Sequence, residues 1–392
     1  MRKLVVLMFT AFVDMVGLVM VLPLLPFYAT EFGADALMVG LLVSAFSIAQ
    51  LLSAPFWGRL SDIRGRRPAI LTGLLVSAVA YVIFAYAGSL LLLLLSRLVQ
   101  GFGGGTIGVV QAYVADASEP HDRAKALGWL SAATSLGAVV GPALGSLLVR
   151  FYGRSAPGLA AAGLCVAVAI FAWKYLGEAR ESLTDSDTHP ATHPATSGGA
   201  ITRVLRSPLE PASRLIWIYA IAIGAFYGTV PVLPLLLADR LAVTETTIGY
   251  LFMYLGGMGL VIRSTILGPM VERLGEIRLC RLGLALLATG LALLWVTFTY
   301  PVLFVSLTLM PLGTAFTFPC VTSLLTRAIR RRERGLYLGV QASFGGVSRV
   351  AFPIAVGLAM DRLGAGVAYL MAGLLVGASV WLTTALDLPS EG

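Results

Sequence analysis

Asp14 is the residue of this sequence whose side chain is best placed to do chemistry, because its carboxyl group interrupts an apolar run near residues 4–28. An ionised carboxylate at the centre of a lipid bilayer costs roughly 2.5–3.5 kcal/mol on insertion scales, and protonation removes that cost. A carboxyl group in such surroundings can therefore bind a proton and release it when its environment changes. The alternative is a structural hydrogen bond to a neighbouring helix.

Three arginines lie within other apolar runs, and they are Arg97, Arg263 and Arg349. A guanidinium cannot relieve its burial cost by losing its proton, so each of them needs a partner. That partner could be a substrate for Arg263 and Arg349, or carbonyl groups at helix ends for all three. Three cations against one acid argue against a site tuned for permanent organic cations. The balance favours a neutral, zwitterionic or anionic amphiphile.

The sequence has no arrangement typical of catalysis or metal binding. No paired carboxylates and no nucleophile constellation occur within the apolar runs. The histidines all lie in polar loops, at His121, His189 and His193. The cysteines fall in separate apolar runs without disulfide or metal-ligand spacing, at Cys165, Cys280 and Cys320. We therefore expect no enzyme activity, no metal and no cofactor, with the proton as the coupling ion.

The composition is that of an integral membrane protein. Of the 392 residues, 58% are hydrophobic and 12% are charged, against roughly a quarter charged in a soluble domain. Twelve apolar runs are long enough to cross a hydrocarbon core of ~30 Å. They lie near residues 4–28, 37–57, 69–88, 90–114, 125–149, 157–176, 213–237, 246–270, 280–299, 301–326, 335–360 and 366–386. Because lipid offers no partner for free backbone groups, we expect an all-α fold with twelve transmembrane helices.

The lysines and arginines predict the orientation. With both termini in the cytoplasm, 21 of the 28 basic residues lie on the cytoplasmic side and four on the opposite side. This bias is the one that membrane insertion imposes. The net charge of +8 then reflects insertion and contact with anionic lipid headgroups rather than nucleic acid. We expect a multi-pass protein of the inner (plasma) membrane, and nothing in the sequence demands more than a monomer.

Two six-helix halves, residues 1–176 and 213–392, flank a polar segment at 177–212. That segment cannot bury enough apolar surface to order itself, so it is expected to be a flexible cytoplasmic linker. The halves repeat each other, since Pro23 recurs as Pro231 at an offset of 208 residues. Two parallel repeats imply a pseudo-twofold axis along the membrane normal, with a substrate site at mid-depth between the halves.

A short basic hairpin at residues 58–68 recurs 210 residues later, with its Gly, acid and Gly in register. The spaced residues are Gly58, Asp62 and Gly65 in the first copy, and Gly268, Glu272 and Gly275 in the second. Gly58 would allow close helix approach, Gly65 would form the turn, and Asp62 could pair with Arg66. A loop needed only for topology explains the arginines but not this spacing.

Gly137, Gly141 and Gly145 are four residues apart and share one helix face. Without side chains at these positions, a neighbouring backbone can come close. Pro142 removes a hydrogen-bond donor and bends the helix. The pattern predicts close packing rather than chemistry.

The motifs described above resemble those of the major facilitator superfamily. The hairpin at 58–68 resembles its loop signature, residues 97–103 resemble its helix-4 motif, and residues 137–145 resemble the helix-5 motif of drug exporters. Asp14 and Gly17, followed by Pro23 and Pro26, look like the first helix of the twelve-helix drug/proton antiporter branch, especially the tetracycline exporters. Two departures are Ser146, which replaces the last Gly of the helix-5 motif, and the lack of a membrane acid in the second half.

The resemblance implies two six-helix bundles and export by alternating access. It places the helices of Asp14 and Arg97 side by side, with Arg97 as a counter-charge that favours ionised Asp14 and takes part in proton transfer. It also implies that the helix-5 glycines and Pro142 lie between the halves and limit leak. In the same fold, Asp62 would face the start of helix 11 and Glu272 would mirror it, so that both act as latches.

Some polar and aromatic residues within the spans should line a mixed cavity for an amphipathic small molecule. The candidates are Gln100, Tyr113, Phe226, Tyr227, Tyr254, Arg263, Gln341 and Arg349. The leading hypothesis is a proton-coupled exporter that exchanges protons for such molecules. The alternative in the same fold is a metabolite or lipid carrier, working as a symporter or an uncoupled facilitator.

Overall fold

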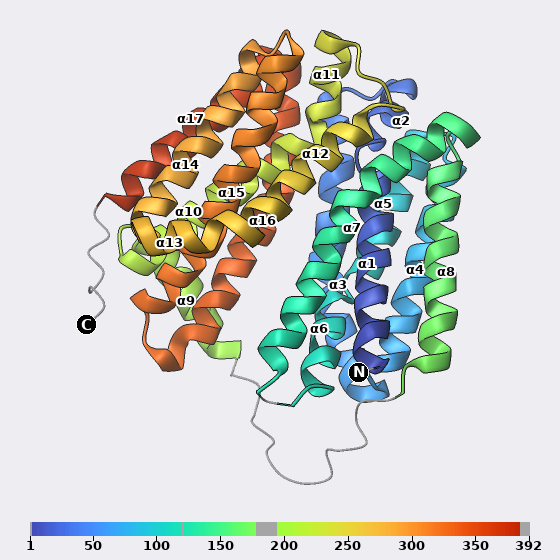
Figure 1. The fold of residues 1–392 in the computed structure, drawn as a ribbon, viewed down its shortest axis with the longest axis horizontal. Helices are drawn as coiled ribbons and strands as arrows, with labels where there is room; N and C mark the ends of the chain where they lie inside the picture. The colour runs from blue at the N-terminus through green and yellow to red at the C-terminus, as the bar shows by residue number, and fades with distance from the viewer. Residues whose placement is uncertain (1, 120, 178–193, 385–392) are drawn as a thin grey trace. The chain divides into compact units, whose positions relative to one another are not determined.

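The structure is a computed structural model that describes residues 2–119, 121–177 and 194–384, and within these ranges it contains helices and no strand (Figure 1). The described residues include 12 helices that are long and apolar enough to cross a membrane. The predicted all-α fold with twelve spans is therefore confirmed. Pro23 lies in the short break that divides the first span into two helices, as expected of a residue that has no backbone N–H.

The chain folds into two compact units. Unit 1 holds the described residues up to 177 together with Val243–Gly256, and unit 2 holds the other described residues. The border falls within the eighth span, between Gly256 and Gly257. The helix that contains this border is α12 (Ile248–Val261).

Unit 1 is built mainly from the first six spans. Its helices are α1 (Arg2–Val21), α2 (Leu25–Glu31), α3 (Ala36–Arg64), α4 (Arg66–Ala85), α5 (Leu90–Gly104), α6 (Ile107–Asp116), α7 (Arg123–Tyr152) and α8 (Ala156–Tyr175). Helix α1 packs on α7 and α8, α4 packs on α5 and α8, and α3 packs on α5. The N-terminal part of the core joins Leu7 and Val13 to Trp57 and Tyr113.

The glycine face of α7 lies directly on the backbone of α1. A Cβ atom at Gly145 would stand 2.4 Å from the carbonyl oxygen of Met20, and one at Gly137 would stand 2.6 Å from that of Phe12. Gly141 meets Val16 in the same way. The expected close approach is thus present, with a helix of the same unit as the neighbour of this glycine face.

Unit 2 contains the remaining helices. They are α9 (Pro194–Arg206), α10 (Pro211–Thr229), α11 (Leu233–Leu241), α13 (Leu267–Leu274), α14 (Glu276–Leu293), α15 (Tyr300–Ala328), α16 (Arg334–Leu363) and α17 (Ala365–Ser379). Helix α14 packs on α15 and α17, and α10 packs on α15 and α16. Gly283 and Gly313 face each other across the α14–α15 contact, where a Cβ at Gly313 would lie 2.7 Å from the carbonyl oxygen of Gly283.

Part of the expected linker is helical. Residues 178–193 lie outside the described residues, but α9 occupies 194–206 and packs on α10 and α16. Ala200 and Val204 are buried four residues apart on its inner face, while Arg203 and Arg206 are exposed. These two apolar residues give the stretch a buried face, although its overall composition is polar.

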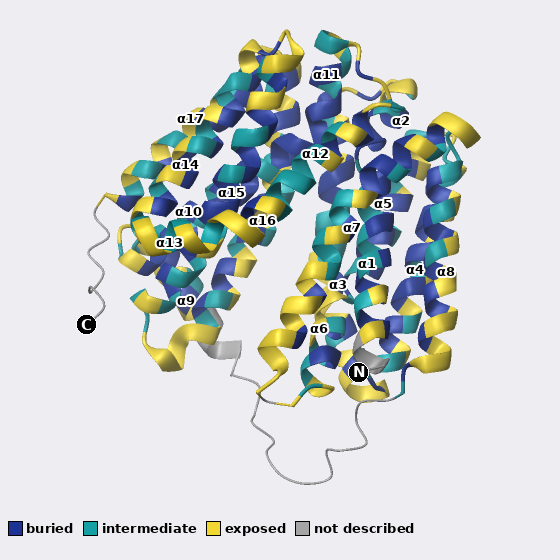
Figure 2. Cartoon of the chain, in the orientation of Figure 1, coloured by how far each residue is buried: buried dark blue, intermediate teal, exposed yellow. Residues whose placement is uncertain are grey.

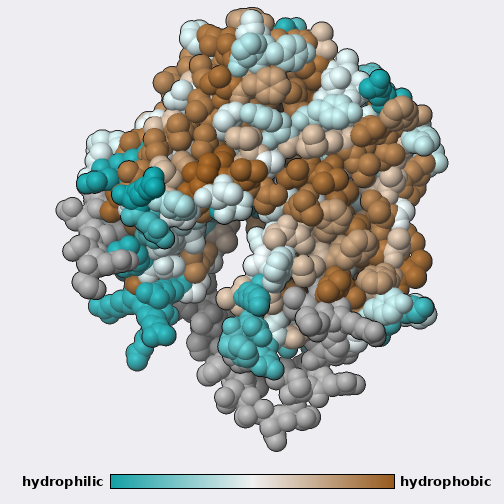
Figure 3. All heavy atoms as spheres, in the orientation of Figure 1, coloured by the Kyte–Doolittle hydropathy of each residue, from teal (hydrophilic) through white to brown (hydrophobic). Residues whose placement is uncertain are grey.

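Each transmembrane helix has a buried side and an exposed side, shown in dark blue and yellow in Figure 2. The exposed sides carry large apolar residues such as Leu91, Leu52 and Leu374, which are 74%, 73% and 63% exposed. Hydrophobic residues cover much of the surface in Figure 3, and hydrophilic ones gather towards the helix ends. Such a surface suits contact with lipid tails.

We predict that Gly145→Ala lowers the stability of the protein, because the new methyl group would collide with backbone that cannot move aside. Overpacking of this kind costs about 1–3 kcal/mol. The thermal unfolding midpoint of the purified protein in detergent should fall by several degrees. Gly163→Ala is the matched control, because no atom lies within 4 Å of its Cβ position. Equal midpoints for the two variants would contradict the close-packing argument.

Candidate functional site

Unit 1 contains a cavity of about 700 Å³ between α1, α4, α6 and α7. Asp14 projects into it from α1 as the one ionisable side chain among the residues that line it. Its other polar lining residues are Thr10, Thr106, Gln111, Ser131 and Thr134. The remaining wall is apolar, with Ile70 and Leu74 from α4 and Leu127 and Leu130 from α7. The site is therefore a large apolar chamber with one carboxyl group.

Helix geometry places the polar groups of this cavity together. Thr10 and Asp14 are four residues apart and share one face of α1, and Ser131 and Thr134 are three apart on α7. The Thr10 hydroxyl donates to the carbonyl oxygen of Val6 at 2.8 Å, and Thr134 donates to that of Ser131 at 2.8 Å. Both hydroxyl hydrogens are thus used within their own helices. Their oxygen atoms remain acceptors for a ligand.

Asp14 also lines a second, much smaller cavity of about 10 Å³, together with Tyr81 of α4 and Gln100 of α5. The side-chain amide of Gln100 donates to the Tyr81 hydroxyl at 2.8 Å, and both side chains are buried. Gly17, one turn beyond Asp14 on α1, makes room for that hydroxyl, which would lie 2.9 Å from a Cβ atom there. Sequence reasoning did not identify Tyr81.

Arg97 is 1% exposed and lies inside unit 1 without forming an ion pair with Asp14 among the described residues. Its guanidinium lies 5.5 Å from the centre of the Phe84 ring. The expected direct counter-charge contact is therefore not formed here. Tyr81 lines the small cavity beside Asp14 and bonds to Gln100, which lies three residues after Arg97 on α5.

Three of the predicted cavity residues are buried and already paired in the structure. Gln100 bonds to Tyr81, Tyr113 donates to the carbonyl oxygen of Gly177, and Gln341 donates to Thr322 at 3.3 Å. None of them lines the large cavity of unit 1. Tyr113 instead ties α6 to the residues that follow α8, which is a structural role.

Of the remaining predicted residues, three form a cluster in unit 2, and Arg263 and Tyr254 lie elsewhere. The guanidinium of Arg349 on α16 lies 4.9 Å from the centre of the Tyr227 ring on α10, and the Phe226 and Tyr227 rings are 5.5 Å apart. Arg263 is exposed on a π-helical turn at Ile262–Ile266. Tyr254 is half-buried on the part of α12 that belongs to unit 1.

The basic hairpins form the expected turns. Gly65 and Gly275 have φ values of +99° and +74°, which favour glycine. Arg66 pairs with Asp62 at 2.8 Å, as predicted, and also with Asp116 at 3.1 Å. Close helix approach at Gly58 is not observed, because no atom lies within 4 Å of its Cβ position. The latch roles of Asp62 and Glu272 stay predictions.

Sequence reasoning missed most of the cavity wall. Thr10, Ser131 and Thr134 are ordinary hydroxyl residues in apolar runs, and their spacing of three or four residues was the available signal. Gln111 is polar within a span, but only the structure shows that it faces the same chamber as Asp14. The helical register between α1, α6 and α7 supplies this information.

Comparison with known proteins agrees with this architecture. The model of the Major Facilitator Superfamily matches residues 7–353 and 215–391. The chain is 29% identical over 347 residues to the tetracycline resistance protein, class G, of Vibrio anguillarum, covering 87% of this chain and 86% of that protein. It is 27% identical over 391 residues to multidrug resistance protein 2 of Bacillus subtilis (strain 168), covering 97% and 94%.

Among solved structures, the fold is similar to that of the human organic anion transporter MFSD10. The TM-score is 0.69 at 24% identity, with 98% of this chain and 99% of that one covered. At this identity the likeness bears on the fold alone, whereas the family model spans nearly the whole chain. The chain therefore belongs to the Major Facilitator Superfamily and is a membrane transporter, not an enzyme.

Proposed function

We propose that this transporter is a proton-coupled exporter that exchanges protons for amphipathic small molecules by alternating access. The observation that carries the proposal is the position of Asp14, the one ionisable side chain on the wall of a cavity of about 700 Å³ in unit 1. A cavity of this size can hold a drug-sized molecule. The names of the tetracycline and multidrug resistance relatives also favour export.

In this proposal Asp14 couples proton movement to substrate movement, because its two protonation states need different surroundings. The ionised carboxylate is stable only where water or a cation reaches it, whereas the protonated group tolerates an apolar chamber. A change in water access to the cavity can therefore load or unload one proton. The Tyr81–Gln100 pair supplies fixed dipoles beside the carboxyl group. We propose that Arg97, buried in the same unit, influences the proton through this pair.

The proposed substrate is a neutral or zwitterionic amphiphile. The sequence argument for an anion counted Arg97 together with Arg263 and Arg349 against one acid, but Arg97 is buried and does not line the cavity. The wall presents one carboxyl group, several hydroxyl oxygens and the Gln111 amide amid apolar side chains. These groups suit an apolar molecule with a few hydrogen-bond donors, and a charged amine is acceptable where Asp14 is ionised.

The charge bias of the loops supports an inner-membrane location with both termini in the cytoplasm. On this orientation the basic hairpins and the start of α9 lie on the cytoplasmic side. The proposed partners are the small-molecule substrate, protons and membrane lipids, and the proposed working form is a monomer. Among the described residues no cluster of three metal-ligating side chains occurs, and the mechanism proposed here uses no metal.

A second candidate is an uncoupled carrier of organic anions. The observation that favours it is the cluster of Arg349 with Tyr227 and Phe226 in unit 2, a half-buried cation among aromatic rings. Such a cluster can bind a carboxylate or sulfonate attached to an aromatic group. The two candidates differ in whether Asp14 or Arg349 limits transport.

We predict that Asp14→Asn abolishes efflux driven by a pH gradient, because the amide can neither bind nor release a proton. Efflux from proteoliposomes should fall to the level of vesicles without protein, while substrate-induced thermal stabilisation in detergent should persist. Asp239→Asn is the matched control, since it removes the same charge from an exposed site at the end of α11. Full gradient-driven efflux by Asp14→Asn would refute proton coupling at this residue.

Arg349→Gln separates the two candidates. If the protein is an anion carrier, the half-saturating concentration of an anionic substrate should rise at least about fivefold, as expected when a charged hydrogen bond is lost. If Asp14 carries the mechanism, transport of neutral substrates should be unchanged. Arg362→Gln, at the exposed end of the same helix, serves as the control. The measurement is initial transport rate against substrate concentration for one neutral and one anionic compound.

A further inference from the structure

The segment Val243–Gly256 packs in unit 1, although the residues on both sides of it belong to unit 2. The chain leaves unit 2 at Ala242, whose φ of +51° marks a left-handed turn after α11, and returns at Gly257. We call residues 243–256 the docked segment. Its contacts with the rest of unit 1 are specific, and the mechanism proposed above does not use them.

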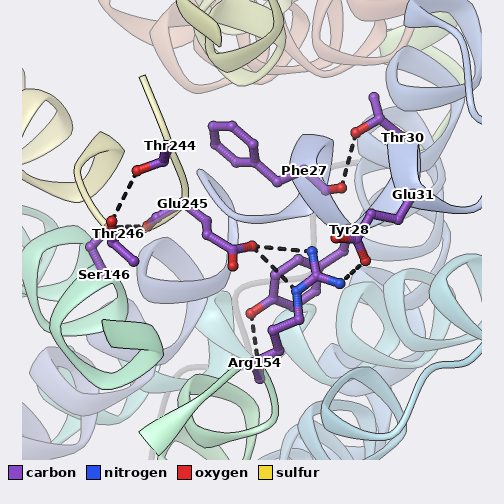
Figure 4. Close-up of polar contacts among 9 residues, drawn as sticks. All are labelled: Phe27, Tyr28, Thr30, Glu31, Ser146, Arg154, Thr244, Glu245 and Thr246. Carbon is purple, nitrogen blue, oxygen red and sulfur yellow. Dashed lines mark hydrogen bonds and ion pairs between the residues drawn. The ribbon is translucent and has the colours of Figure 1, made fainter. Parts of the chain in front are cut away.

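Ser146 holds the docked segment from α7. Its hydroxyl donates a hydrogen bond to the carbonyl oxygen of Glu245 at 2.6 Å (Figure 4). It also accepts one from the backbone N–H of Gly249 at 2.9 Å. The Ser146 side chain is fully buried. This residue stands where the helix-5 motif ends in glycine, and a glycine could make neither bond.

The fit beside Ser146 leaves no room for a side chain at Gly249 and little room at Gly256. A Cβ atom at Gly249 would lie 2.0 Å from the carbonyl oxygen of Pro142, and one at Gly256 would lie 3.2 Å from that of Ala138. The latter carbonyl lacks its usual helical donor because Pro142 has no N–H. The docked segment therefore contacts α7 at three positions, Glu245, Gly249 and Gly256.

Arg154 holds the same segment by charge. It follows α7 and forms ion pairs with Glu31 of α2 and with Glu245 of the docked segment, the latter at 3.2 Å (Figure 4). Its guanidinium lies 4.8 Å from the centre of the Tyr28 ring, and the Tyr28 hydroxyl donates to its carbonyl oxygen at 2.8 Å. Tyr28 and Glu31 thus hold the guanidinium in place on unit 1, in a position where it also pairs with Glu245.

The chain beyond the docked segment has the means to bend. Gly257 and Gly259 follow at once, and the π-helical turn Ile262–Ile266 separates α12 from α13. Glycine relaxes backbone restraints, and π-helical turns inside helices are frequent at functional sites. The eighth span is therefore anchored to unit 1 at one end and is adaptable where it enters unit 2.

We propose that Ser146 and Arg154 are positioning residues of the transport cycle. Together they hold the docked segment on unit 1, and the two units exchange transport states when this hold is released. The part concerning the cycle rests on the proposed alternating access, whereas the hold itself does not. The ion pairs are half-exposed and hence weak, so the hold is strong enough to bias the equilibrium and weak enough to break.

The test measures release of the segment directly. Ile248 lies in the docked segment and is 0% exposed, so a cysteine there reacts with a thiol reagent only after release. Ile248→Cys is made in a background in which the buried cysteines Cys165, Cys280 and Cys320 are alanine. Ser146→Gly, Arg154→Ala and Glu245→Ala are then added one at a time, and the labelling rate of the full-length protein is followed in proteoliposomes.

We expect each added substitution to raise the labelling rate about threefold to tenfold, the effect of losing one hydrogen bond or partly buried ion pair. Arg154→Ala with Glu245→Ala should label no faster than Arg154→Ala alone, because both remove the same pair. Arg150→Ala is the matched control. Arg150 lies on α7 four residues before Arg154, and its guanidinium lies 5.8 Å from the centre of the Phe151 ring, outside the docked segment. Ser343→Ala controls for Ser146, because its hydroxyl donates to the carbonyl oxygen of Gly339 in its own helix, α16.

Unchanged labelling in both Ser146→Gly and Arg154→Ala would overturn the hold. Arg154→Lys, which keeps the charge but cannot bind both carboxylates in the same way, should lie between wild type and Arg154→Ala, and it replaces the alanine variant if that variant does not fold. The maximal efflux rate is measured on the same vesicles. Faster labelling with an unaltered efflux rate would overturn the role in the cycle. If Asp14→Asn keeps full coupled efflux while Arg154→Ala still labels faster, the hold stands and the proton-coupling proposal fails.

Discussion

The structure depends on the inability of lipid to pair polar groups. Backbone donors within a span must find their partners inside the protein, and many hydroxyl groups do the same. Thr10 and Thr229 do so by donating to carbonyl oxygens one turn earlier in their own helices. Asp14 cannot, because an ionised carboxylate has no hydrogen to donate and a protonated one depends on its surroundings. The same constraint that imposes twelve helices therefore singles out one group whose stable state changes with access to water.

The constraint also explains how the two halves resemble each other. Arg66 pairs with Asp116 in unit 1, and Glu276 pairs with Arg327 in unit 2. These residues are related by offsets of 210 and 211 positions, close to the repeat of the basic hairpins, yet the charges are exchanged. What recurs is an ion pair that joins the start of one span to the end of the next, at a level where charges can remain hydrated. The repeat thus preserves a contact rather than a residue type.

Much of this architecture could be predicted because membrane physics acts on sequence locally. Span length and the isolation of Asp14 follow from neighbouring residues alone, and so does the turn at Gly65. Other features depend on which helix faces come together, which a single sequence does not specify. The pairing of Tyr81 with Gln100 is one example. Burial of Val204 in a segment expected to be a linker is another. A short apolar stripe forms an ordered helix only when other helices pack against it, here α10 and α16.

A continuous set of backbone contacts within unit 1 connects the backbone around Asp14 to the start of α12. The α1 carbonyl groups on either side of Asp14 lie against Gly137 and Gly141 of α7. The same helix lies against Gly249 of α12 at the carbonyl oxygen of Pro142, and α12 continues into unit 2 at Gly257. Contacts between backbones have no side-chain rotamers to absorb a displacement, and close-packed interiors compress little. The glycines of α7 therefore leave little slack between α1 and α12.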